Sequence, residues 1–311
     1  MGILKGKVRF FLFKKGVDKM AKPGREGRVT VPGGQVWYKV VGSGDKIPLL
    51  TLHGGPGAGH DYLETLDGLA EDRPVIFFDQ LGCGKSDAPD DISLWRIERF
   101  VEEVATVRTA LGLDRIHLLG QSWGGWLAIE YMMGQPEGIV SLILASTSAS
   151  LSQVAEETSR LKATLPQAVR AVLERYEATG DYHHPEYEDA MMEFYNRFVC
   201  RLDPWPDPAM RTLNNLTTNP VPYETMQGPN EFTITGNLKD WDRSDRLGEI
   251  TVPTLITCGR YDELGPACAE TLHQGIPNAE VRIFEQSAHM AHLEEMALYN
   301  QVLQAFLARV D

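Results

Sequence analysis

A serine stands on a sharp turn between a strand-like segment and a helix-like segment. Residues 120–124 read Gly-Gln-Ser-Trp-Gly, directly after the apolar run 116–119 and before a helix-like stretch at 126–133. The glycines on either side of Ser122 let the backbone turn without a Cβ clash. A serine on such a strand-to-helix turn has its hydroxyl directed into a cleft. The segment therefore predicts a nucleophilic serine in a protein of alternating strands and helices.

Apolar runs and amphipathic segments alternate along the rest of the chain. The sequence predicts a hairpin over 28–41, strands at 47–52, 74–78, 116–119 and 139–144, and helices at 61–70 and 93–111. The alternation stops near residue 147 and resumes with strands at 252–257 and 280–284 and a last helix at 290–310. Alternating buried strands and helices predict a parallel sheet covered on both faces.

The interruption divides the chain into predicted units. Residues 26–146 and 247–311 form the core, and residues 147–246 form an inserted helical cap. Proline-rich pieces at 203–208 and 219–222 predict turns within the cap. About 100 residues is an ordinary size for a folded unit.

Charge and cysteine content exclude several classes of function. The formal net charge of −13 argues against nucleic acid as a partner. No apolar run is long enough to span a bilayer. The four cysteines form no C-x-x-C pair and no cluster with histidines at zinc-ligand spacing, which predicts reduced thiols in a cytoplasmic protein. They are Cys83, Cys200, Cys258 and Cys268.

The first 25 residues carry a net charge of +7, opposite in sign to the rest of the chain. An apolar stretch at 8–13 is too short and too interrupted for a signal peptide. We expect this basic arm to dock on the acidic body of the protein itself or of a neighbour. The alternative, a weak anchor on an anionic membrane, is supported only by the aromatic and basic composition.

A serine hydroxyl needs a base, and the base needs an orienting carboxylate. Asp262 follows the strand at 252–257, and His289 follows the last strand, so serine, acid and histidine occur in the order that this kind of serine hydrolase uses. His292 is the competing base, three residues further on and within the predicted helix. The sequence thus predicts a triad of Ser122, His289 and Asp262, with no metal ion or cofactor.

An oxyanion hole needs two backbone N–H groups near the nucleophile. One comes from Trp123, directly after the serine, and the other comes from the loop 53–57, for which Gly55 is the predicted donor. Triad and loops together predict an α/β-hydrolase fold with a mostly parallel sheet and an inserted helical cap.

Three motifs carry a resemblance to a known family. Residues 53–57 (His-Gly-Gly-Pro-Gly), 79–86 (Asp-Gln-Leu-Gly-Cys-Gly-Lys-Ser) and 120–125 (Gly-Gln-Ser-Trp-Gly-Gly) together resemble the proline iminopeptidases, which include the tricorn-interacting aminopeptidase of archaea and related L-amino acid amidases. The match runs from about residue 27 to the C-terminus and includes the segment 228–233. The resemblance implies cleavage of an unblocked N-terminal residue, often proline, and implies that Glu231 and Glu263 hold the substrate ammonium.

The chemistry of the implied substrate agrees with the charge of the cap. A buried ammonium needs charge-assisted acceptors, which a pair of carboxylates provides. Residues 151–245 carry 16 acidic and 9 basic side chains, which favours a cationic substrate. Aromatic residues of the cap could line an apolar pocket or form the core of the cap; they are Trp205, Tyr223, Phe232 and Trp241.

The expected function is a serine hydrolase that releases an unblocked N-terminal amino acid, proline or another small or apolar residue, from small peptides or amides through an acyl-enzyme. An L-amino acid amidase that acts on small amides would share every motif. An esterase or lactonase of the same fold would prefer substrates without a free amine. A non-catalytic receptor would not need the intact set of serine, acid, histidine and oxyanion loop.

Overall fold

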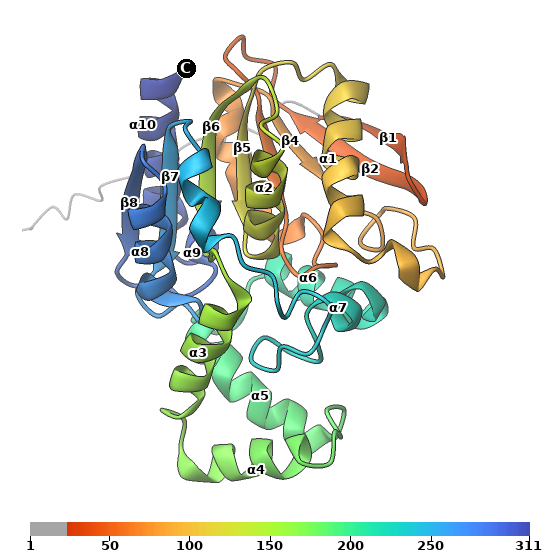
Figure 1. Ribbon diagram of the computed structural model, residues 1–311, viewed down its shortest axis with the longest axis vertical. Coiled ribbons are helices and arrows are strands. Elements are labelled where there is room, and N and C mark those ends of the chain that lie inside the picture. The colour runs from red at the N-terminus through yellow and green to blue at the C-terminus, as the bar shows by residue number, and fades with distance from the viewer. Residues whose placement is uncertain (1–23) are drawn as a thin grey trace, which may run out of the picture.

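An eight-stranded sheet forms the centre of the protein in the computed structural model, which describes residues 24–311 (Figure 1). The strand order is β1-β2-β4-β3-β5-β6-β7-β8. The hairpin β1–β2 is antiparallel, β2 pairs antiparallel with β4, and all further pairs are parallel. The strands are β1 (Arg25–Val31), β2 (Gly34–Val41), β3 (Leu49–Leu52), β4 (Val75–Phe78), β5 (Ile116–Gln121), β6 (Ile139–Ala145), β7 (Thr254–Gly259) and β8 (Ala279–Phe284).

The central strands are buried on both faces of the sheet, and successive strand residues point to opposite faces. Leu50 and Phe78 belong to one hydrophobic cluster, with residues of α1 (Ile97–Leu111), α2 (Trp123–Met133) and α8 (Gly265–Gly275). Their neighbours Leu49 and Phe77 belong to a second cluster on the other face, with the 3₁₀ helix η1 (Asp61–Glu71) and α10 (Met296–Val310). The predicted α/β-hydrolase fold with a mostly parallel, doubly covered sheet is confirmed.

Five helices follow β6 before the chain returns to the sheet at β7, and they extend from one end of the sheet (Figure 1). They are α3 (Leu151–Lys162), α4 (Gln167–Glu177), α5 (Pro185–Phe198), α6 (Asp207–Thr218) and α7 (Val221–Met226), with the short 3₁₀ helix η3 (Ser244–Glu249) before β7. The predicted break in the strand–helix alternation is therefore seen here. That residues 147–246 act as a cap unit stays a prediction.

The structure differs from the sequence-based expectations at several boundaries. The basic arm lies outside the described residues except for its last two, and Arg25 already pairs with Val40 in the β1–β2 ladder. The predicted helix at 61–70 is a 3₁₀ helix, and the predicted last helix is divided at Glu295 into α9 (Ala291–Glu294) and α10. The Glu295 carboxylate accepts hydrogen bonds from Gln286 N (3.0 Å) and Ser287 Oγ (2.6 Å) in the preceding loop, so the break supports that loop.

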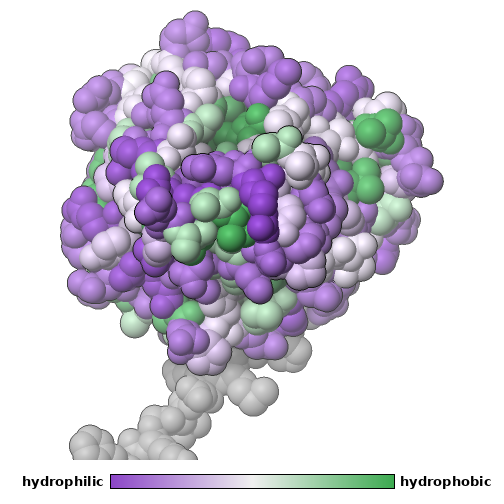
Figure 2. All heavy atoms as spheres, turned by 90° about the horizontal axis from the view of Figure 1, so that it is seen from below, coloured by the Kyte–Doolittle hydropathy of each residue, from purple (hydrophilic) through white to green (hydrophobic). Residues whose placement is uncertain are grey.

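The face over the inserted helices is mostly hydrophilic, with separate small hydrophobic spots between hydrophilic residues (Figure 2). In the part of the chain that the structure describes, helices are too short or too polar to cross a bilayer.

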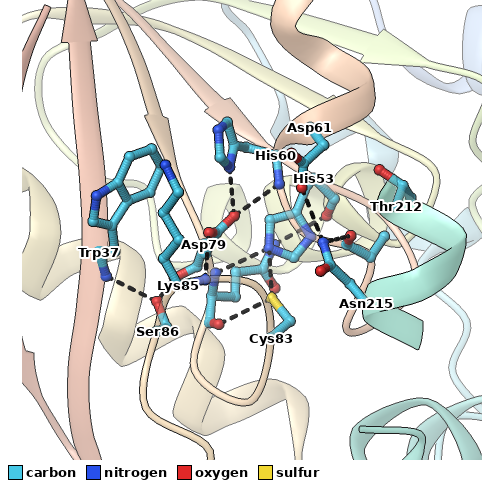
Figure 3. A network of polar contacts seen from close by, with 12 residues as sticks. Trp37, His53, His60, Asp61, Asp79, Cys83, Lys85, Ser86, Thr212 and Asn215 are labelled. Atoms are coloured by element: carbon cyan, nitrogen blue, oxygen red, sulfur yellow. Dashed lines mark hydrogen bonds and ion pairs between the residues drawn. The ribbon is translucent and has the colours of Figure 1, made fainter. Parts of the chain in front are cut away.

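A buried carboxylate connects the loops that leave β3 and β4 (Figure 3). Asp79 Oδ1 accepts hydrogen bonds from His60 N (2.8 Å) and pairs with His60 Nδ1 (2.7 Å), while Oδ2 accepts one from Lys85 N (2.9 Å). Gly84 has a positive φ of 54°, and a Cβ there would lie 2.3 Å from Asp79 Oδ2. Burial alone would raise the pKa of Asp79, but the hydrogen bond and charge of His60 outweigh it and lower that pKa below its usual value. The carboxylate therefore fixes both loops in its ionised form.

We predict that Asp79→Asn lowers the free energy of unfolding by about 2 kcal/mol, because an amide NH₂ would face N–H donors that have lost a charged acceptor. The low folded-state pKa also makes this contribution dependent on pH. It is fully present above the unfolded carboxyl pKa of about 4 and is lost as the pH falls below it. Urea unfolding at pH 7 and at pH 3.5 measures both effects. Asp90→Asn, on the exposed part of the same loop, is the control; equal midpoints for the two variants would contradict the prediction.

Candidate active site

The turn that carries Ser122 is strained and closely packed. Ser122 lies between β5 and α2 with φ 57° and ψ −124°. A Cβ on Gly120 would lie 2.1 Å from the Gly124 carbonyl oxygen, and one on Gly124 would lie 2.1 Å from the Leu52 oxygen. Only glycine fits these two positions, so the motif found in the sequence is what allows α2 to start directly against β3 and β5.

His289 and Asp262 form a buried hydrogen-bonded pair. His289 Nδ1 lies 2.8 Å from Asp262 Oδ1, which also accepts a hydrogen bond from Leu264 N (3.0 Å). Burial of the ring lowers the pKa of His289, but the charge of Asp262 and its hydrogen bond outweigh burial and raise that pKa above its usual value. Ser122 and His289 line the same cleft. The competing base His292 packs between Tyr62 and Tyr299 instead, and burial lowers its pKa to about 3.

Neighbouring elements hold the loops after β7 and β8 in place. The carbonyl of Phe198, the last residue of α5, accepts hydrogen bonds from Glu263 N (3.1 Å) and His289 N (3.3 Å). The Glu294 carboxylate accepts one from Ala288 N (2.7 Å). The inserted helices thus hold both loops, and α9 also holds the loop after β8.

Two backbone N–H groups beside Ser122 are free to bind an oxyanion. Within residues 24–311, the N–H groups of Gly55 and Trp123 make no hydrogen bond to a protein acceptor. The neighbouring Gly54 N–H is already used, because it donates to Tyr62 Oη (2.7 Å). The arrangement agrees with Gly55 and Trp123 as the two donors.

A cleft opens beside Ser122. Its lining is mostly apolar and includes Trp205 and residues of α6, and it also contains Glu231. Of the other aromatic residues singled out in the sequence, Tyr223 and Trp241 are buried, and half-buried Phe232 packs against Phe194. Only Trp205 of these four lines the cleft.

Glu263 is a buried carboxylate without a hydrogen-bond donor. It is fully inaccessible to solvent, and neither of its side-chain oxygens has a hydrogen-bond partner within residues 24–311. Its Oε1 lies 3.8 Å from His289 Nδ1. Burial raises the pKa of Glu263 well above its usual value, and the charges of Glu231 and Asp262 raise it further. The pKa of Glu231 is also raised, chiefly by burial, although the charge of His289 and the Tyr223 hydroxyl lower it.

Among residues 24–311, two groups of side chains have potential metal ligands within 4.8 Å of one another: His53, Asp79 and Cys83, and His60, Asp61 and Glu64. The first group is already engaged within the protein. His53 Nε2 accepts a hydrogen bond from Gln80 N (2.9 Å), and burial raises the pKa of the Cys83 thiol well above its usual value. A neutral thiol is a poor metal ligand, so this group fits a structural network better than a metal site.

The sequence analysis missed several residues that shape the site. Gln80 Nε2 donates to the His53 carbonyl oxygen (3.0 Å), and Gln80 Oε1 accepts from Trp123 Nε1 (2.8 Å). Tyr62 and Gln121 likewise connect the loop after β3 with the serine turn. Both glutamines lie inside the quoted motifs, so the signal was present, but only the geometry shows what their amides bind.

Comparisons with known proteins agree with this architecture. The family model of the α/β hydrolase fold matches residues 47–296. The chain is 42% identical over 288 residues to the proline iminopeptidase of Saccharolobus solfataricus, with 92% of this chain and 93% of that protein covered. It is 43% identical over 292 residues to the proline iminopeptidase of Lactobacillus helveticus, with 92% and 98% covered.

Solved structures of similar proteins indicate the same family. The proline iminopeptidase of Mycobacterium smegmatis has a TM-score of 0.85 and 37% identity, covering 92% of this chain and 98% of that one. The structure of VinJ has a TM-score of 0.91 and 36% identity, covering 93% and 100%. This chain belongs to the proline iminopeptidase family of α/β hydrolases and is a serine hydrolase of the aminopeptidase type.

Proposed function

We propose that this enzyme removes the first amino acid, bearing a free amino group, from small peptides or amino acid amides, with Ser122 as nucleophile. The observation that carries the proposal is Glu263, a buried carboxylate with two unpartnered oxygens beside the His289–Asp262 pair. An unpaired buried carboxylate is costly, and a bound ammonium would supply both the missing donors and the missing charge. Glu231 would hold the same ammonium from the cleft side.

The raised pKa values of both glutamates fit this role. Without a cation, burial favours the protonated carboxyl. A substrate ammonium would favour the ionised form, so both glutamates would be fully ionised only when a free amine enters the cleft. A blocked amine carries no positive charge and offers no such compensation.

The proposed reaction follows from the geometry of the loops. His289, oriented by Asp262, takes the proton from Ser122 Oγ as that oxygen attacks the carbonyl carbon of the first residue. The Gly55 and Trp123 N–H groups stabilise the resulting oxyanion. His289 then protonates the leaving amine, and water releases the amino acid from the acyl-enzyme. None of these steps requires a metal ion or cofactor.

The mostly apolar cleft supports proline or another small or apolar first residue. The amidase and esterase alternatives share the triad, so substrate profiling separates them. A cytoplasmic location and the role of the basic arm stay predictions.

We expect turnover of prolyl-, alanyl- or phenylalanyl-p-nitroanilide and little turnover of their N-acetylated forms, because only the free amines carry the ammonium. Initial rates for the six compounds measure this, with Ser122→Ala as the blank, in which kcat should fall roughly 10⁶-fold. Initial rates for the corresponding amino acid amides show whether the enzyme hydrolyses small amides faster than anilides. Equal or faster turnover of the acetylated compounds would contradict amine recognition and favour the esterase alternative.

We predict that Glu231→Gln and Glu263→Gln each lower kcat/KM for the free-amine anilides about 10- to 100-fold, since each removes a charge-assisted hydrogen bond. Hydrolysis of p-nitrophenyl acetate, which has no amine, should change less than about threefold. Glu188→Gln, an exposed carboxylate on α5, is the matched control. A loss of equal size on both substrates would mean that the glutamates support the triad rather than the amine.

The raised pKa of His289 predicts the pH dependence. Catalysis needs the neutral ring, so kcat/KM, which reports the free enzyme, should rise with pH along an acidic limb whose midpoint lies above 6.5. Asp262→Asn removes the charge that raises this pKa, so the midpoint should move to lower pH while kcat falls about 10⁴-fold. Profiles of kcat/KM for p-nitrophenyl acetate against pH test this for both enzymes. An unshifted midpoint in the variant would show that Asp262 does not set the pKa of the base.

A further inference from the structure

A single buried phenol lies where three loops of the site meet. Tyr62 belongs to η1, outside the motifs that carry the triad, and its side chain is 2% exposed. Its Oη accepts a hydrogen bond from Gly54 N (2.7 Å), in the loop that carries Gly55. The same oxygen donates to Oε1 of Gln121, the residue before Ser122. Tyr62 therefore joins the proposed oxyanion loop to the serine turn.

Gln121 extends the connection to the third loop. Its Nε2 donates to the backbone oxygen of His289 (3.3 Å). The donors and acceptors match along the path from Tyr62 to His289. The phenol gives its one proton to the amide oxygen of Gln121, and the amide NH₂ at the other end of Gln121 donates to the His289 carbonyl oxygen. A reversed amide would place NH₂ against the Tyr62 proton and an oxygen against the His289 carbonyl.

The Tyr62 hydroxyl keeps its proton and lies close to the backbone of Gly54. Burial raises the pKa of Tyr62 far above its usual value, so the proton stays on the oxygen. A Cβ on Gly54 would lie 2.9 Å from Tyr62 Oη and 2.9 Å from Gln121 Oε1. A side chain at position 54 would therefore displace this contact.

We propose that Tyr62 is a positioning residue for the acyl-transfer machinery: its hydroxyl, through Gln121, sets the Gly55 N–H, Ser122 and His289 relative to one another. This inference rests on the proposed roles of those three residues. Tyr62 gives up no proton during the reaction, since its proton is committed to Gln121. Its contribution is geometric, and geometry matters because a displacement of about 1 Å can cost 100-fold in rate.

The test compares Tyr62→Phe with Tyr299→Phe. Tyr299 is also 2% exposed, and its hydroxyl bonds Thr257 (3.1 Å), away from the three loops. Each substitution removes one buried, hydrogen-bonded oxygen, so their effects on the free energy of unfolding should be similar. With p-nitrophenyl acetate, Tyr62→Phe should lower kcat about 10- to 100-fold with KM within about twofold. The midpoint of the acidic limb should not move, because Tyr62 is not among the groups that shift the pKa of His289.

A second readout removes the dependence on substrate binding. The rate at which a fluorophosphonate labels Ser122 should fall by a similar factor, since the tetrahedral adduct places an oxygen in the same hole. Gln121→Met removes the other half of the Tyr62–Gln121 bridge. The double variant should be little slower in labelling and in kcat than either single variant, because both substitutions break the same connection.

The possible failures are distinguishable. A wild-type enzyme that neither reacts with the fluorophosphonate nor hydrolyses the ester overturns the proposed function, and this inference with it. An active wild type in which Tyr62→Phe behaves like Tyr299→Phe overturns the inference alone. A rise in KM without a fall in kcat, or fully multiplicative losses in the double variant, also overturns it.

Discussion

The close backbone contact between the serine turn and β3 determines the arrangement of everything else at the site. With glycine at position 124, α2 starts directly against the Leu52 carbonyl. Because β3 and β5 are adjacent and parallel, the loop that leaves β3 then lies beside Ser122. This adjacency places the loop of Gly55 beside the turn of Trp123, and the side chains of Gln80 and Tyr62 then connect the two segments. The strain at Ser122 is sustained because buried strands on both sides leave the turn no room to relax.

Burial of charge is the second constraint on the site. Asp262, Glu263 and Glu231 lie close together around one histidine, and desolvation opposes the ionisation of each glutamate. Asp262 Oδ1 accepts a hydrogen bond from His289 and another from Leu264 N, although Asp262 Oδ2 accepts none from residues 24–311. Within the same residues, neither oxygen of Glu263 accepts a hydrogen bond. This contrast between two adjacent carboxylates, one bound to the histidine and one unbound, supports assigning them different roles.

The sequence predicted those features that depend on local pattern or on chain order. The strands, the turn at Ser122 and the order of Ser122, Asp262 and His289 all follow from periodicity and from residues placed after strands. The break at Glu295 was missed, because an apolar helical pattern continues through it while the Glu295 carboxylate bonds the preceding loop. The Tyr62–Gln121 bridge was missed because it joins residues 59 positions apart, and no local pattern encodes such a contact.

The inserted helices are part of the site and do not simply cover it. The last carbonyl of α5 bonds the backbone N–H groups of both Glu263 and His289. On α6, Arg211 forms ion pairs with Asp61 and Glu64 of η1, beside the residues of α6 that line the cleft. A change in how these helices pack would therefore move the loop of His289 and the cleft wall. The insertion thus contributes in two ways, because α6 lines the cleft while the last carbonyl of α5 bonds the loop of His289.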